Sequence, residues 1–462
     1  MKGFVKLIAV VVTAAAFAVS CSKDKDSGAV SFDKPAVFID APSGMATVGF
    51  TLRNIKTLSV TSQPTGWDEP MLDQTTGMLT VIAPSATALE KGTAVESGTV
   101  VLAGVTPGGT SVSGVLFVGV VKTVDLSAAG VANSYMASVK ETNYLFDVMH
   151  KGDGSPLATD HLGVIWKSAS GLVQYLQMEN GKASFYIGAD TEDSNKILKG
   201  NAVIGAYDAN DELIWSWHVW VTDAPQTMTY GNGTVFMDRN LGAAGTTAGG
   251  TDAYGMYYQW GRKDPFYGGE KTETSANAFL EAKNGTVVNP AYPALDWAFS
   301  KSATTTDGAA ANPMTFYNDK VGTGYNWLAS PNATLWGEAK TLNDPCPPGY
   351  RVPGTGAWED LISGRQYIDG VSVWDGTNYG MTYTHGGQTA WYPAQGYRNY
   401  SSGAIVGLRS STGGSGAYWS AETSSVKSYY LFFRSKLSSS GSINNELDMN
   451  RSYGYTVRCC KE

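Results

Sequence analysis

Short apolar runs, broken by Gly, Pro, Asn and Asp, restrict the fold of this chain more than any other feature. In one of them Ala46, Val48, Phe50 and Leu52 alternate with other residues and share one face of an extended strand. Runs of strand length with turn residues between them predict a β-sandwich over residues 30–123. The expected strands of this unit are 36–39, 46–52, 78–82, 98–102 and 114–121.

A second β unit is predicted over residues 124–228. Two strands, 201–207 and 213–221, flank a turn, and the second strand carries three tryptophans. Trp215 and Trp217 share one face of that strand, whereas Trp220 lies on the other. Tryptophans in this arrangement form either a platform for sugar rings or part of a core. Because both faces of the strand carry apolar residues, we favour the core.

The N-terminus predicts export and a lipid anchor. Two lysines precede a short apolar stretch, and small residues lead to Cys21, which indicates a signal peptide over residues 1–20. The Ala-Val-Ser-Cys end of this segment resembles the lipobox of bacterial lipoproteins, with Ala18 in place of the usual leucine. That resemblance implies acylation of Cys21, a tether over residues 21–29 and an outer-membrane lipoprotein that faces the cell surface. The alternative is an ordinary signal peptide followed by a chance cysteine.

The charge balance limits the partners. The formal net charge is −8 and becomes −10 when residues 1–20, which hold two lysines and no acids, are removed. An acidic chain without a basic run is a poor candidate for nucleic acid, and it has no polybasic patch for anionic lipid. The chain is therefore expected to attach to a membrane through its lipid. Its expected ligand is an extracellular glycan or protein.

Three further cysteines lie in the last third of the chain. An exported protein keeps disulfides, so Cys346 is expected to pair with either Cys459 or Cys460. A strained bridge between the neighbours Cys459 and Cys460 is an alternative, and a three-cysteine metal site is a weaker one because CxxC spacing is absent. No metal and no cofactor is predicted.

The last half of the chain carries a series of motifs in a fixed order. They are TVFMDRNLGA at 234–243, YGMYYQWGRKDPF at 254–266, DPCPPGYRVP at 344–353, YWSA at 418–421 and GYTVRC at 454–459. This series resembles the Fibrobacter succinogenes major paralogous domain, or Fib-succ-major family, over residues 229–462. The resemblance implies an α+β fold of the C-type-lectin-like kind.

The expected architecture is thus multidomain and mainly β. The stretch around Trp67 is similar to immunoglobulin-like modules of Bacteroidetes surface proteins, so two N-terminal β-sandwich (Ig-like) modules are expected before the α+β C-type-lectin-like domain. In that domain a helix is expected from Gly356, and a closing strand from Tyr455. A composition with 54 glycines, 16% charged and 11% aromatic residues is typical of a β-rich extracellular protein.

Catalytic signatures are missing from the sequence. It contains no HExxH, no GxSxG and no phosphate-binding loop, and none of its four histidines has a second histidine at metal spacing. Carboxylates such as Asp369 and Asp375 are available to form an acid pair, but nothing in the sequence marks them above chance. The chain is therefore not expected to be an enzyme.

The region 396–453 has the composition of a binding surface. It holds 15 Ser, 6 Tyr and 4 Asn but only three acids, and Tyr, Ser and Asn are enriched in antibody binding loops. We expect an adhesin-like role, with a structural tip or accessory subunit of a surface fibre as the first alternative and a polysaccharide-active enzyme as the second. The expected contact residues are Tyr397, Arg398, Asn399, Tyr400, Arg409, Tyr429, Tyr430 and Arg434.

Overall fold

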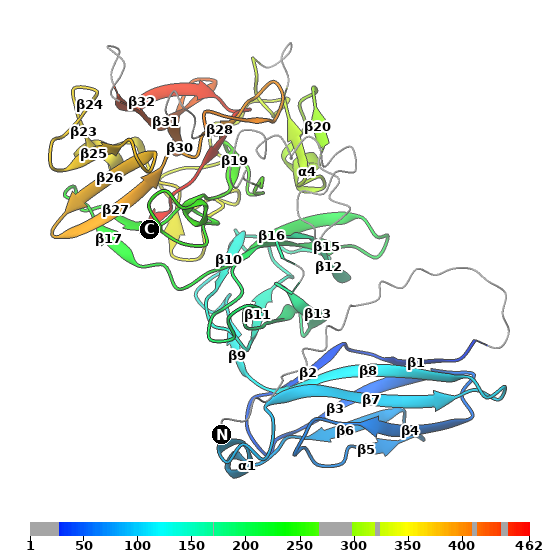
Figure 1. The fold of residues 1–462 in the computed structure, drawn as a ribbon. Helices are drawn as coiled ribbons and strands as arrows, with labels where there is room; N and C mark the ends of the chain where they lie inside the picture. The colour runs from blue at the N-terminus through cyan, green and yellow to red at the C-terminus, as the bar shows by residue number, and fades with distance from the viewer. Residues whose placement is uncertain (1–26, 170, 268–297, 319–323, 409–413, 436–441) are drawn as a thin grey trace.

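A computed structural model describes residues 27–462, except 170, 268–297, 319–323, 409–413 and 436–441 (Figure 1). The predicted signal peptide, Cys21 and most of the tether lie outside the described residues, as does Arg409. The described chain is mainly β and forms several separate sheets, as the sequence predicts. Within the described residues, no helix has the length and apolar character needed to cross a membrane.

The N-terminal unit consists of two packed four-stranded sheets, with strand orders β1-β3-β6-β5 and β2-β8-β7-β4. Val48 and Phe50 point into the core between them, whereas Leu52 lies at the strand end and is exposed. The predicted β-sandwich is confirmed for this unit. Its elements are β1 (Ala29–Phe32), β2 (Ala36–Ile39), β3 (Met45–Arg53), β4 (Thr57–Ser62), β5 (Met71–Asp73), β6 (Met78–Ile82), α1 (Ala86–Glu90), β7 (Ser97–Val105) and β8 (Ser111–Val120).

The second unit also contains two four-stranded sheets, with strand orders β13-β14-β11-β9 and β10-β16-β15-β12. An aromatic contact joins it to the first unit, since the rings of Phe117 and Tyr175 stack with their centroids 4.3 Å apart. Its strands are β9 (Lys122–Asp125), β10 (Ser134–Ala137), β11 (Thr142–Asp147), β12 (His161–Lys167), β13 (Gln174–Glu179), β14 (Lys182–Ile187), β15 (Gly200–Tyr207) and β16 (Leu213–Val221).

Strand β16 separates two cores. Trp215 and Trp217 lie in the core between the two sheets of the second unit. Trp220 lies on the opposite face, in a core that continues into the C-terminal part, and its indole N–H donates to Ala243 O at 2.9 Å. The core role predicted for these tryptophans is confirmed. A hydrophobic core therefore crosses the predicted boundary at residue 228.

The C-terminal part is built around a sheet with the strand order β29-β28-β33-β30-β31-β32, which β19 joins through β33. Beside it lie the sheet β17-β18-β34-β22, the sheet β25-β26-β27 and the pairs β20-β21 and β23-β24. The bounds are β17 (Thr227–Thr229), β18 (Val235–Met237), η1 (Thr251–Ala253), β19 (Tyr257–Gln259), β20 (Ala298–Ser300), α4 (Thr306–Ala310), β21 (Thr315–Tyr317), β22 (Tyr350–Arg351), η2 (Thr355–Leu361), β23 (Ile362–Ser363), β24 (Gln366–Tyr367), β25 (Ser372–Asp375), β26 (Gly380–His385), β27 (Gln388–Pro393), β28 (Tyr397–Arg398), β29 (Ile405–Val406), β30 (Ser415–Ser424), β31 (Lys427–Arg434), β32 (Ile443–Asn450), β33 (Gly454–Thr456) and β34 (Cys460–Lys461).

Helical structure is sparse in the described residues of this part. The helix expected from Gly356 is the 3₁₀ helix η2 (Thr355–Leu361), which ends where β23 begins, and α4 has only five residues. The expected closing strand is also shorter than predicted. It is divided into β33 and β34, with residues 457–459 between them.

A disulfide joins Cys346 to Cys459, so one of the two expected pairings is confirmed. The bond spans 113 residues and lies in the core shared with the second unit. Asp344 fixes the loop before it, because its carboxylate accepts the backbone N–H groups of Cys346 and Val352 at 2.8 and 2.9 Å. Cys460 is free and buried, so the vicinal bridge and the three-cysteine metal site do not form.

Candidate ligand-binding pocket

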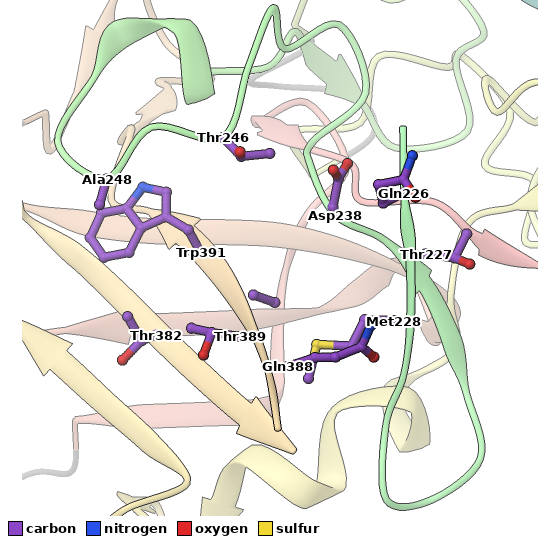
Figure 2. Close-up of a pocket in the computed structure, with 11 residues that line it drawn as sticks. Gln226, Thr227, Met228, Asp238, Thr246, Ala248, Thr382, Gln388, Thr389 and Trp391 are labelled. Carbon is purple, nitrogen blue, oxygen red and sulfur yellow. The ribbon is translucent and has the colours of Figure 1, made fainter. Parts of the chain in front are cut away.

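A pocket of about 400 Å³ opens between β17, the segment 238–248 and the hairpin of β26 and β27 (Figure 2). Its volume lies within the range of small-molecule sites in proteins. The lining combines hydroxyl, amide, carboxylate, thioether and indole groups. The lining residues are Gln226, Thr227, Met228, Asp238, Thr246, Ala248, Thr382, Gln388, Thr389, Ala390 and Trp391.

The β26–β27 hairpin supplies one wall through the alternation of its side chains. His385 pairs with Gln388 across a two-residue turn, and Gly386 and Gly387 both have positive φ, at 55° and 78°. Such a turn requires this conformation at both central positions, which glycine adopts without strain. The paired strands direct one set of side chains into a core, namely Met381, Tyr383 and Tyr392. The opposite set, Thr382, Thr389 and Trp391, faces the pocket.

Trp391 forms one end of the pocket, and Figure 2 shows its ring nitrogen on the side of Ala248. The ring lies over Gly380, where an added Cβ would come within 2.4 Å of two ring atoms. A glycine at position 380 is therefore required for this ring position. Trp391 is only 6% exposed, so it offers an edge rather than a full face.

The polar side chains of the lining fall into two groups. Within the described part of the chain, Thr227, Thr246 and Gln388 make no side-chain hydrogen bonds to other residues, whereas Gln226, Thr382 and Thr389 each make one. Asp238 differs, because its two carboxylate oxygens accept hydrogen bonds from Arg239 at 2.8 and 3.0 Å. Arg239 also donates to Thr222 Oγ1 at 2.9 Å. The pocket thus presents neutral donors and acceptors beside one neutralised carboxylate.

This lining differs in its carboxyl groups from the site of a usual glycoside hydrolase. Hydrolysis by the usual mechanisms needs two carboxyl groups on either side of the scissile bond. Asp238 is the single carboxylate among the described lining residues, and it is ion-paired. Across the described residues, no cluster of three or more His, Cys, Asp or Glu side chains is arranged to hold a metal ion.

Seven of the eight contact residues expected from composition are described, and none of these seven lines this pocket. Tyr397 and Tyr400 instead belong to a tyrosine cluster, in which the Tyr400 ring lies 4.6 Å from Tyr325 and 4.9 Å from Tyr453, between centroids. Tyr397 contacts Tyr453 at 5.7 Å. Asn399, Tyr429 and Arg434 are half-buried.

Two of the expected contact residues are buried. Arg398 is 1% exposed and donates to Gly403 O at 2.6 Å, and burial lowers its pKa to about 9. Tyr430 is 6% exposed and packs against Tyr455. Their side chains stabilise the sheet from inside, which corrects the predicted contact set for these two residues.

Comparison with known proteins adds little. No family model and no curated protein matches the chain. A protocadherin gamma B7 structure with extracellular cadherin domains 1–4 is 11% identical, covers 44% of this chain and 53% of its own, and has a TM-score of 0.15. The Bacteroides ovatus mixed-linkage glucan utilization locus SGBP-B, in complex with mixed-linkage heptasaccharide, is 10% identical, covers 43% and 45%, and has a TM-score of 0.12.

A mouse clustered protocadherin structure with extracellular domains 1–3 is 16% identical, covers 42% of this chain and 67% of its own, and has a TM-score of 0.15. The chain spans about half the length of the first two of these structures. TM-scores this low identify neither a fold nor a function for this chain.

Proposed function

We propose that this protein is a non-catalytic extracellular protein that binds a neutral glycan through the pocket between β17 and the β26–β27 hairpin. The observation that carries the proposal is the lining itself. Uncommitted hydroxyl and amide groups from Thr227, Thr246 and Gln388 surround the pocket, and a tryptophan edge closes one end. Sugars present hydroxyl groups beside apolar C–H faces, so they match a site of neutral hydrogen-bonding groups and apolar side chains.

The location of the protein is part of the same proposal. We propose acylation of Cys21, which would present the two N-terminal β units and then the pocket outward from the outer membrane. The Cys346–Cys459 disulfide supports an oxidising compartment, since such bonds persist outside the cytosol. The C-type-lectin-like fold of residues 229–462 and the Fib-succ-major family are proposed on the sequence motifs alone.

The binding claim is tested with the mature chain on an array of neutral oligosaccharides, followed by calorimetry with the best binder. Loss of one hydrogen-bonding side chain is expected to weaken binding by roughly three- to tenfold. Gln388→Ala should show this loss. Gln366→Ala is the matched control, because Gln366 is exposed on β24 and does not line the pocket. Absence of binding on the array, or equal affinity of the two variants, would contradict the proposal.

A further inference from the structure

A second pocket, of about 290 Å³, lies where the second unit meets the C-terminal part. Lys151 and Trp215 come from the second unit, and the other walls come from α4 and the segment 332–343. The walls are firmly placed. Leu335 belongs to the core that crosses the two parts, and Leu342 packs against the core of the second unit.

The ammonium group of Lys151 is the distinctive feature of this pocket. It lies 5.0 Å from the centroid of the Trp215 ring and has no acidic partner within 4 Å among the described residues. The backbone holds it there, since Lys151 N donates to Ser155 O at 2.8 Å and Lys151 O accepts from Gly154 N at 2.9 Å. Lys151 is half-buried, so its charge lies in the pocket and not on a free surface.

Further charged groups of both signs surround this ammonium group. The Lys263 ammonium group lies 4.4 Å from the centroid of the same Trp215 ring and pairs with the buried Asp264. Arg262 is also buried and lies 3.6 Å from Asp264. Burial lowers the pKa of Lys263, and the charges of Arg262 and Lys151 add to the lowering. Three carboxylates, Asp264, Asp307 of the pocket rim and Asp153, which interacts electrostatically with Lys151, match the three cationic groups here.

Several other lining residues are neutral and polar. Thr306, Thr334 and Asn343 line the pocket with hydroxyl and amide groups. Asn332 contributes a further amide, whose oxygen already accepts hydrogen bonds from Thr334. A ligand for this site needs one negative charge for Lys151 and hydroxyl groups for these side chains. Its size must be small, because the pocket is at the lower end of ligand-site volumes.

We propose that this second pocket binds the carboxylate of an acidic saccharide, such as a uronic acid unit, with Lys151 as the charge partner. The inference stands apart from the neutral-glycan pocket, which uses different residues. A charge-assisted hydrogen bond is stronger than a neutral one. Loss of Lys151 should therefore weaken binding of a uronate by about tenfold or more.

The test uses the full mature chain, with trigalacturonic acid as the probe and a neutral galactose trisaccharide as its counterpart. Lys151→Met keeps an apolar stem over Trp215 and should lose at least about tenfold in affinity for the acidic probe. Lys122→Met is the control, because Lys122 is exposed on β9 and lines none of the pockets described here. Asp307→Asn removes the rim carboxylate and should raise the affinity for the acidic probe, by about twofold at low salt.

The thermal midpoint of each variant shows whether it is folded. Equal affinity of wild type and Lys151→Met for trigalacturonic acid, at matched thermal midpoints, would overturn the inference. Gln388→Ala separates the two proposals, because it should leave Lys151-dependent binding of the acidic probe unchanged while weakening binding of neutral glycans.

Discussion

His218 on β16 should make the stability of this protein depend on pH. The ring is 2% exposed, its Nε2 lies 2.8 Å from Asn201 Oδ1, and burial lowers its pKa to about 3. In the unfolded chain the group has an ordinary pKa of about 6.5. The unfolded chain therefore takes up a proton first as the pH falls. The contribution of the neutral His218 ring to the free energy of unfolding is complete above about pH 6.5. It is lost progressively between pH 6.5 and 3.

The size of the loss follows from the pKa difference. Each pH unit in this window costs about 1.4 kcal/mol in the free energy of unfolding. Between pH 7.5 and pH 5.0 the loss assigned to His218 is therefore about 2 kcal/mol. A His218→Gln variant keeps an amide near Asn201 and cannot take up this proton, so it should lack this part of the pH dependence.

The measurement is urea unfolding of both proteins at pH 7.5 and 5.0, monitored by intrinsic tryptophan fluorescence. The stability gap between wild type and variant should narrow by about 2 kcal/mol at the lower pH. All other ionisable groups are the same in both proteins, so their effects cancel. A gap that stays the same at the two pH values would refute the assignment of a buried neutral His218.

Three further predictions concern the core and the cysteines. Replacing Cys346 and Cys459 by alanine should lower the free energy of unfolding by about 4–5 kcal/mol, because the bond closes a loop of 113 residues; urea unfolding checks this. Trp217→Ala should cost about 3–5 kcal/mol in the same assay, since the side chain is 1% exposed and its loss leaves a cavity. Burial raises the pKa of the Cys460 thiol to about 11, so iodoacetamide should label Cys460 in the unfolded protein and not in the native protein at pH 8.

Much of the architecture could be read from local patterns. The strand predicted at 213–221 is β16, and the apolar residues on both of its faces correctly indicated a strand with a core on each side. The alternation at 46–52 placed Val48 and Phe50 inward. These successes share a cause, because strand periodicity depends on neighbours in sequence and on burial alone.

The pocket could not be predicted in this way. Its lining comes from three separate stretches, 226–228, 238–248 and 382–391, which only the paired strands bring together. The alternation of polar and apolar residues from Met381 to Tyr383, followed by the Gly386-Gly387 turn, was the available local signal. The prediction of Arg398 as a contact residue was wrong for a related reason. Arginine is usually exposed, and sequence alone does not show that backbone carbonyls and the Tyr257 ring surround its guanidinium group.

The central claim is that the pocket beside the β26–β27 hairpin holds a neutral glycan. Carbene footprinting of the mature chain, with and without the best array binder, tests it directly. The account predicts protection of Gln388 and Thr389, which line the pocket and are exposed, and unchanged labelling of Tyr397 and Tyr400 in the tyrosine cluster. Protection of the tyrosine cluster with unchanged labelling of Gln388 and Thr389 would contradict it.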